Sequence, residues 1–193
     1  MRLLLATRNP HKVREFGELL APHDVDELPA SVLLPPEVGD TFAANALDKA
    51  RAAAAATGRI TIADDSGIAA EALGGAPGVR SARYAGEHAT DEENLHKLLH
   101  EAPAGSPVAY VCALAYVDPH APVEHLVEGR CTGVLAAEPR GTGGFGYDPA
   151  FVPDDYDDGR TMAELTPEEK HAISHRARAA RALLDWLVTA GTY

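Results

Sequence analysis

Apolar residues along the chain alternate between two spacings, one typical of strands and one typical of helices. Short aliphatic runs at residues 2–6 and 60–63 predict buried strands, and longer runs at 108–117 and 123–135 predict two more. A short edge strand is expected around 25–28. Apolar positions three and four apart predict helices after residue 12, over 41–57, from 91 to 99 and from 177 to 188.

Several helix ends carry recognisable capping residues. Gly58 closes the alanine-rich helix over 41–57, and Thr90 with Glu93 forms a capping box at the start of another. Thr166 and Glu169, with a proline at the first helical position between them, predict a further helix start.

Composition narrows the class of protein. The 193 residues are 46% hydrophobic and 24% charged, which is ordinary for a globular chain and is most simply explained by one domain over residues 1–193, in two lobes. The net charge of -12 argues against duplex DNA or an anionic membrane as a partner. A phosphate ester would need locally gathered cations and a metal ion.

Two further features bear on location and redox state. Cys112 and Cys131 belong to no zinc-like cluster and are expected to be reduced, structural thiols. The N-terminal apolar run is too short for a signal peptide, and no run is long enough to span a bilayer, so we expect a cytoplasmic protein.

The candidate centre of chemistry is the stretch from Asp64 to Gly67, directly after the strand predicted at 60–63. In an open α/β sheet, ligands gather at the carboxyl ends of strands, and two adjacent carboxylates in a turn there can bind Mg²⁺. The alternative is a turn in which Asp64 and Asp65 bond only to nearby backbone groups.

Three other stretches could contribute to such a site. Thr7 to Lys12 precedes a helix, whose free N–H groups could bind phosphate, although a solvated cap is the alternative. Asn45 and Lys49 share one helix face, which could equally point to solvent. The glycine-rich loop around Phe145 lets a ligand approach closely and offers a ring for stacking, or it is a flexible hairpin end.

Six ordered motifs together resemble the inosine triphosphate pyrophosphatase family, from residue 3 to about residue 188. They are Thr7-x-Asn9-x-x-Lys12, Thr41-Phe42-x-x-Asn45-Ala46-x-x-Lys49-Ala50, Ala63-Asp64-Asp65-Ser66-Gly67, Gly75-Ala76-Pro77-Gly78, Gly143-Gly144-Phe145-Gly146-Tyr147-Asp148-Pro149 and Lys170-x-x-x-Ser174-His175-Arg176. Six motifs in one order are far more specific than any single one.

The resemblance implies an enzyme that hydrolyses ITP, dITP and XTP to the monophosphate and pyrophosphate with Mg²⁺. It implies an elongated mixed β-sheet with helices, two lobes flanking a central nucleotide-binding cleft, and a homodimer. Asp65 would be the catalytic carboxylate and, with Glu37, a metal ligand; Asp64 is the other candidate for the catalytic base. The residues that would bind substrate are Thr7, Arg8, Asn9, Pro10, His11, Lys12, Lys49, Ser66, Phe145, Gly146, Tyr147, Asp148, Lys170, His175 and Arg176.

These roles agree with the chemistry of the reaction. Lys12 and Lys49 would stabilise the pyrophosphate leaving group, and two carboxylates as close as Asp64 and Asp65 should have split pKa values unless one metal binds both. Donors from His175 and Arg176 would favour bases with an oxygen at the 6-position.

One position departs from the family. The family commonly has Glu immediately before its Asn-Ala pair, and this chain has Ala44 there. Glu37 or Asp40 could supply the missing charge. Two rival functions stay open: a related septum-inhibition type of pyrophosphatase acting on pyrimidine or modified nucleotides, and a nucleotide-binding module that has lost activity through the change at Ala44.

Overall fold

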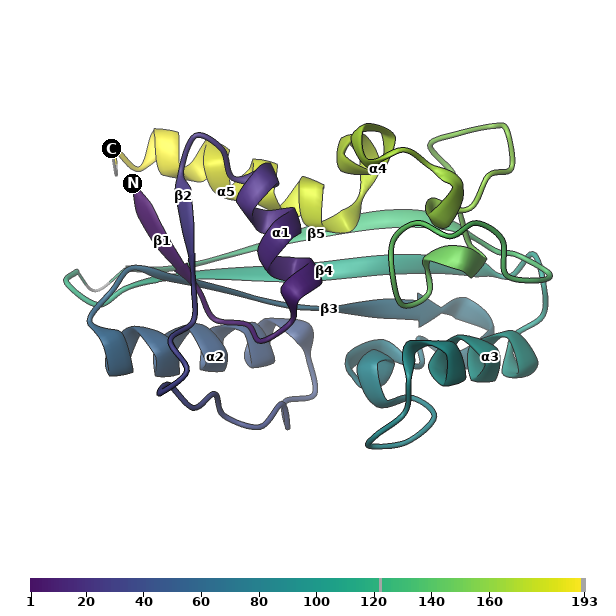
Figure 1. Cartoon of the computed structure of the whole chain (residues 1–193), viewed down its shortest axis with the longest axis horizontal. Helices are drawn as coiled ribbons and strands as arrows, with labels where there is room; N and C mark the ends of the chain where they lie inside the picture. Colours follow the sequence, from purple (N-terminus) through teal and green to yellow (C-terminus); the bar gives the residue numbers. More distant parts are fainter. Residues whose placement is uncertain (122, 192–193) are drawn as a thin grey trace. The chain divides into compact units, whose positions relative to one another are not determined.

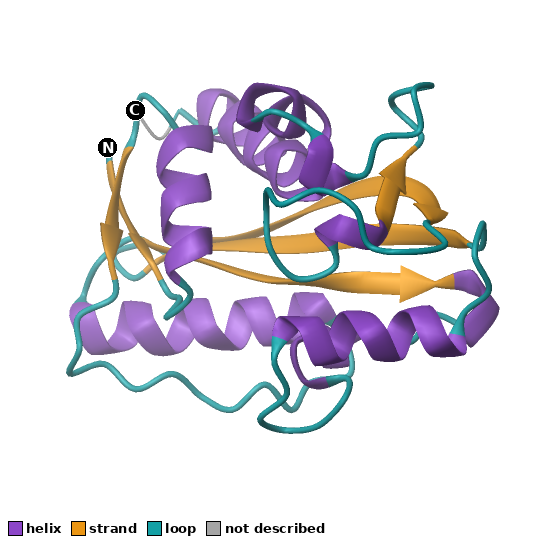
Figure 2. Cartoon of the chain, turned by 45° about the vertical axis from the view of Figure 1, so that its right-hand side comes forward, coloured by secondary structure: helices purple, strands orange, loops and turns teal. Residues whose placement is uncertain are grey.

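The computed structural model describes residues 1–121 and 123–191. Within them, six strands form a mixed sheet in the order β2-β1-β3-β4-β5-β6 (Figure 2). β1 pairs in parallel with β2 and β3, and β5 pairs antiparallel with β6. The strands are β1 Arg2–Leu5, β2 Asp24–Glu27, β3 Thr61–Ala70, β4 Pro107–Asp118, β5 Val123–Leu135 and β6 Phe151–Pro153. The predicted α/β fold with a mixed sheet is confirmed.

The chain divides into two compact units. Unit 1 comprises Met1–Asp65, Cys112–Gly129 and Arg176–Tyr193, and unit 2 comprises Ser66–Val111 and Arg130–His175. β3, β4 and β5 therefore each contribute residues to both units. The elongated sheet, the central cleft and the organisation as one domain with two lobes stay predictions.

Unit 1 has helices on both faces of its strands (Figure 1). Helices α1 (Pro10–Leu19) and α5 (His175–Thr189) pack on one face, where Phe16 and Leu183 meet Leu114 of β4 in one apolar cluster. Helix α2 (Phe42–Thr57) covers the other face, where Ala50 packs with Ala113. Neighbouring strand residues thus point to opposite helices, as the period of two in a β-strand requires.

β3 corrects one prediction from the sequence. The run at 60–63 was expected to end in a polar turn at Asp64 and Asp65, but the strand continues unbroken from Thr61 to Ala70. Ile62 packs among the residues of α1 and α5, and Ala63 packs among those of α2. The strand continues through the carboxylates because side chains within unit 1 satisfy both of them: Lys12 pairs with Asp64, and Asn45 donates to Asp65.

Unit 2 contains helices α3 (Asp91–Glu101) and α4 (Pro167–Ile173), with short 3-10 helices at Glu71–Leu73, Gly78–Arg83, Asp148–Ala150 and Met162–Glu164. Both predicted capping boxes are present, Thr90 with Glu93 and Thr166 with Glu169. The core of this unit includes Ile68 of β3, Leu98 of α3 and Phe151 of β6. In the described part of the chain, no helix combines the length and the apolar character needed to cross a membrane.

Gly67 brings β3 into close contact with the 3-10 helix at residues 78–83. The hydroxyl of Ser81 accepts a hydrogen bond from the backbone N–H of Ile68 at 2.9 Å and donates one to the carbonyl of Gly78 at 2.7 Å. A Cβ on Gly67 would lie 2.3 Å from the Ser81 Oγ and 2.6 Å from the Gly78 carbonyl oxygen. Only a residue without a side chain fits this position.

We therefore expect Gly67→Ala to lower the free energy of unfolding by about 1–3 kcal/mol, because the added methyl group overpacks a backbone contact. Chemical denaturation measures the change. Gly17→Ala is the matched control: it lies in α1 with no atom within 4 Å of an added Cβ. That change should raise stability by about 0.5–1 kcal/mol, as expected in a helix interior. Equal stability of Gly67→Ala and wild type would contradict the packing argument.

Candidate active site

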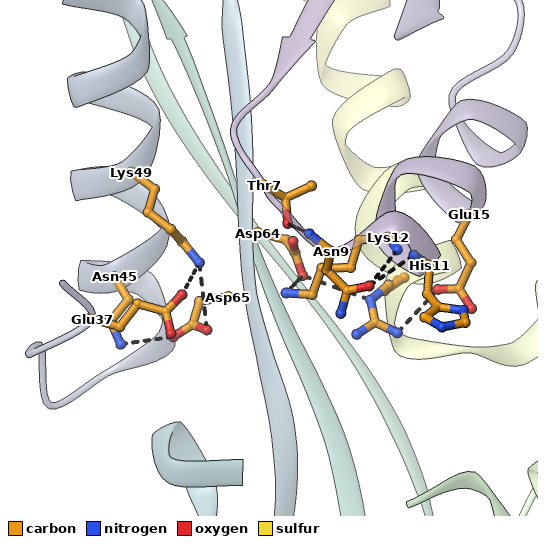
Figure 3. Close-up of polar contacts among 11 residues, drawn as sticks. Thr7, Asn9, His11, Lys12, Glu15, Glu37, Asn45, Lys49, Asp64 and Asp65 are labelled. Atoms are coloured by element: carbon orange, nitrogen blue, oxygen red, sulfur yellow. Dashed lines mark hydrogen bonds and ion pairs between the residues drawn. The ribbon is translucent and has the colours of Figure 1, made fainter. Parts of the chain in front are cut away.

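Asp64 lies on the face of β3 that α1 and α5 cover, where two cations surround it. Its side chain is fully buried, and its Oδ2 lies 2.8 Å from the ammonium of Lys12 and 3.8 Å from the Nε of Arg176. The guanidinium of Arg176 also donates to Glu15 at 3.1 Å. Figure 3 shows Lys12 reaching from α1 towards Asp64.

These cations decide the charge of Asp64. Burial by itself would raise the pKa of the carboxyl, but the positive charges of Lys12 and Arg176 outweigh it, and the net pKa lies below the ordinary value. A carboxylate held ionised in this way is a poor proton acceptor and a good anchor for cations.

Asp65 points to the opposite face of the strand, towards α2. Its Oδ2 accepts a hydrogen bond from the Nδ2 of Asn45 at 2.8 Å, and its Oδ1 lies 3.9 Å from the ammonium of Lys49. Lys49 also pairs with Glu37, so one ammonium joins two carboxylates (Figure 3). The solvent-facing alternative for Asn45 and Lys49 is wrong, because their exposed fractions are only 2% and 6%.

Asp65 has a different protonation balance from Asp64. Burial raises its pKa, and the nearby charge of Glu37 raises it further, while Lys49 and the hydrogen bond from Asn45 act in the other direction. The net pKa lies above the ordinary value. Lys49 has a raised pKa, because the carboxylates around it outweigh the effect of its burial.

The pair Glu37 and Asp65 has the chemistry of a magnesium site. No group of three or more His, Cys, Asp or Glu residues that could hold a metal occurs among the described residues. Mg²⁺, however, is often held by one or two carboxylates together with substrate phosphates, and the shared contact with Lys49 shows that these carboxylates converge. Of the two acids that could compensate for Ala44, Glu37 makes this contact, whereas Asp40 is exposed.

The turn at residues 7–12 is organised by Asn9. Its side-chain oxygen accepts hydrogen bonds from the N–H groups of His11 (2.9 Å) and Lys12 (3.4 Å), and Thr7 Oγ1 accepts from the N–H of Asn9 (3.2 Å). Pro10 begins α1 and has no N–H to offer. The prediction of free N–H groups is therefore wrong at His11 and Lys12, and the ammonium of Lys12 is the cation that this turn supplies.

Arg8 makes contacts that its position in the phosphate motif did not reveal. Its guanidinium donates to four backbone carbonyls in the segment between β2 and α2, at 2.7–3.4 Å: those of Leu28, Pro29, Ala30 and Val32. The same segment continues to Glu37. Arg8 thus attaches the turn that carries Lys12 to the segment that carries Glu37.

In unit 2, the predicted residues of the glycine-rich loop gather on Asp148. This carboxylate is 4% exposed; its Oδ2 accepts from the ammonium of Lys170 and from the N–H of Phe145, both at 2.9 Å. The ammonium of Lys170 lies 5.2 Å from the ring centre of Phe145, within cation–π range. Gly144 has φ of +68°, and a Cβ there would lie 2.0 Å from Asp148 Oδ2.

The remaining predicted residues have separate environments. The N–H of Gly146 donates to Asp91 at 3.0 Å. The side chain of Tyr147 is buried in the core and donates to the carbonyl of Ser81 at 2.7 Å, so it serves packing in unit 2. Ser66 is half-buried in β3.

His175 reveals a residue that the sequence analysis missed. Its ring stacks on Tyr110 of β4 with ring centres 4.6 Å apart and planes 11° apart, and the Tyr110 hydroxyl donates to Asp148 Oδ1 at 3.1 Å. Tyr110 sits within an apolar run that predicts only a buried strand, so no local pattern marks it.

Comparisons with known proteins decide the family. The Ham1 family model matches residues 3–186. A dITP/XTP pyrophosphatase of Shigella flexneri is 50% identical over 196 residues, with 96% of this chain and 98% of that protein covered. This chain belongs to the Ham1 family. The resemblance to the pyrophosphatases of non-standard purine nucleotides is thereby confirmed.

Solved structures agree with this Ham1 assignment. A HAM1 protein from Coxiella burnetii has a TM-score of 0.86 at 40% identity, covering 98% of this chain and 99% of that one. A protein from Mycobacterium abscessus, titled nucleoside-triphosphatase / dITP/XTP pyrophosphatase, has a TM-score of 0.75 at 45% identity, covering 95% and 99%.

The two aspartates of this Ham1 chain should respond oppositely to loss of charge. Asp64→Asn should lower the free energy of unfolding by about 3–5 kcal/mol at pH 7, because it breaks a buried ion pair. Asp65→Asn should raise it, because the folded protein disfavours that charge. Denaturation of metal-free protein in a chelator measures both effects.

The pH dependence gives the sign of each effect. The folded pKa of Asp64 is lowered, so its contribution is full above the unfolded value of about 3.9 and is lost as pH falls through the folded value. The folded pKa of Asp65 is raised, so the advantage of Asp65→Asn should shrink as pH falls through that value. Equal destabilisation by both substitutions at pH 7 would contradict the different charge environments of Asp64 and Asp65.

Proposed function

We propose that this protein hydrolyses the deaminated purine nucleoside triphosphates ITP, dITP and XTP to the nucleoside monophosphate and pyrophosphate, with Mg²⁺. The observation that carries the proposal is the arrangement around β3, where Asp64 meets Lys12 and Arg176 while Asp65 meets Lys49 and Glu37. Membership of the Ham1 family, with a 50% identical relative named dITP/XTP pyrophosphatase, supports it.

The reaction breaks one phosphoanhydride bond. A water oxygen forms a bond to the α-phosphorus, the bond to the α-β bridging oxygen breaks, and the bridging oxygen leaves with the electron pair as part of pyrophosphate. The water must lose a proton during this step. In this scheme Asp65 is the carboxylate that accepts or orients that proton, since Asp64 is fully buried and ion-paired with Lys12 at 2.8 Å.

Glu37 and Asp65 are the carboxylates that would hold Mg²⁺. When bound, Mg²⁺ neutralises charge on the phosphate oxygens and lowers the pKa of a bound water. Lys49 lies against both carboxylates and supplies positive charge at the same place, where it stabilises the departing pyrophosphate.

Asp64 serves as a positioning residue in this scheme. It is fully buried and ion-paired, so it holds the ammonium of Lys12 for the triphosphate and does not exchange protons during the reaction. Arg176 lies beside the same carboxylate in unit 1. Contact between Arg176 and the purine remains a prediction from the resemblance.

The residues that the resemblance assigns to the base and that unit 2 contains are suited to that task. Phe145 offers a ring for stacking, and Lys170 and His175 are donors suited to an oxygen at the 6-position of hypoxanthine or xanthine. Adenine carries an amine at that position and would leave such donors without an acceptor. Such donors would therefore favour the deaminated purines over ATP.

The homodimer that the resemblance implies and the cytoplasmic location that the sequence predicts belong to the same proposal. Light scattering coupled to size-exclusion chromatography distinguishes a dimer from a monomer.

Purified protein with Mg²⁺ should convert XTP, ITP and dITP to monophosphate and pyrophosphate much faster than ATP, GTP, dTTP or UTP. Separation of the products by ion-exchange chromatography identifies which bond is cleaved. Faster turnover of dTTP or UTP would instead support the septum-inhibition type, and tight binding of ITP without turnover would support the binding module.

Asp65→Asn should lower kcat by about 10²- to 10⁴-fold, because a general base typically contributes that much. Asp48→Asn is the control: it makes the same change in unit 1 on the exposed face of α2, and it should retain full activity. Full turnover by Asp65→Asn would remove the catalytic role while leaving the proposed reaction intact.

A further inference from the structure

Tyr110 contacts His175, which is proposed to recognise the base, and Asp148, which contacts the two other residues proposed for that task. It lies in the unit 2 part of β4 with 6% of its surface exposed. Its ring stacks on His175 at 4.6 Å and on Phe151 at 4.5 Å, and its hydroxyl donates to Asp148 Oδ1 at 3.1 Å. The ring of Tyr110 therefore contacts His175, and its hydroxyl contacts the carboxylate of Asp148 in the glycine-rich loop.

Asp148 also accepts hydrogen bonds from two further residues, Lys170 and Phe145. While Tyr110 holds Oδ1, Oδ2 receives the ammonium of Lys170 and the N–H of Phe145, both at 2.9 Å. A carboxylate held at both oxygens cannot rotate without breaking a hydrogen bond inside a buried site. The plane of Asp148 thus sets where the ammonium of Lys170 lies, 5.2 Å from the Phe145 ring centre.

We infer that Tyr110 is a positioning residue for purine selection, an inference that rests on the proposed function. Its hydroxyl orients Asp148 and, through it, Lys170 and Phe145, and its ring fixes the plane of His175. The two effects come from different parts of the side chain. They can therefore be removed one at a time.

Tyr110→Phe removes the hydroxyl and retains the stacked ring. We expect KM for XTP and ITP to rise about 3- to 10-fold, the size of one lost hydrogen bond, with kcat within about twofold of wild type. Tyr110→Leu removes the ring as well and should raise KM further, because His175 then loses its stacking partner. Inorganic triphosphate, which has no base, should inhibit wild type and both variants equally.

Tyr116→Phe is the matched control. Tyr116 also lies in β4 and is fully buried, but it packs against Trp186 in unit 1, and its hydroxyl has no hydrogen-bond partner among the described residues. Removing this hydroxyl should leave kcat and KM for every nucleotide unchanged. A similar rise in KM from Tyr116→Phe would overturn the inference, because any buried tyrosine would then have the same effect.

A double-mutant cycle distinguishes positioning from general loss of structure. If Tyr110 acts through Asp148 on Lys170, the change Tyr110→Phe should add little to KM in a protein that already carries Lys170→Met. Fully additive effects would overturn the inference, as would an unchanged KM in Tyr110→Phe or a weaker inhibition by inorganic triphosphate. The wild-type assay separates the two proposals. If the wild type is inactive on all purine triphosphates, both the proposed function and the role of Tyr110 are wrong. If the wild type is active and Tyr110→Phe has an unchanged KM, only the role of Tyr110 is wrong.

Discussion

The pleat of a single strand separates the two carboxylates at the centre of this protein. Because successive residues of β3 point to opposite faces, Asp64 meets the cations of α1 and α5, while Asp65 meets α2 and Glu37. Two like charges adjacent in sequence thus point to opposite faces of the strand, although each also feels the charge of the lysine on the other face. Each carboxylate acquires its own partners without any turn or insertion in the chain.

This separation lets one dipeptide perform two tasks. A carboxylate surrounded by cations remains charged and keeps those cations in place, whereas a carboxylate near a second acid is closer to accepting a proton. The energetic cost of burying Asp65 is consistent with a functional site, where local stability is commonly sacrificed for reactivity. The structural and chemical roles therefore fall on neighbouring residues.

Local patterns predicted the helices and their caps, because a cap depends on residues three or four apart, such as Thr90 and Glu93. Local patterns failed at β3, where two adjacent aspartates predicted a turn. The strand continues there because side chains distant in sequence pair with these carboxylates. Tyr110 was missed for the same reason. In the sequence it is one of many residues in an apolar strand, and its role depends on contacts with Asp148 and His175, which are distant in sequence. The family resemblance supplied the candidate residues, but neither it nor the local patterns supplied these pairings.

The contacts of Arg8 have a consequence for how the segment before α2 can vary between related proteins. Its guanidinium donates hydrogen bonds to main-chain oxygens, those of Leu28, Pro29, Ala30 and Val32. These contacts place no demand on the exposed side chains of Pro29 and Ala30, whereas Leu28 and Val32 are constrained by their burial in the core around α2. The length of the segment is constrained as well, because one residue inserted or deleted would change which carbonyls face the arginine and displace Glu37 with them.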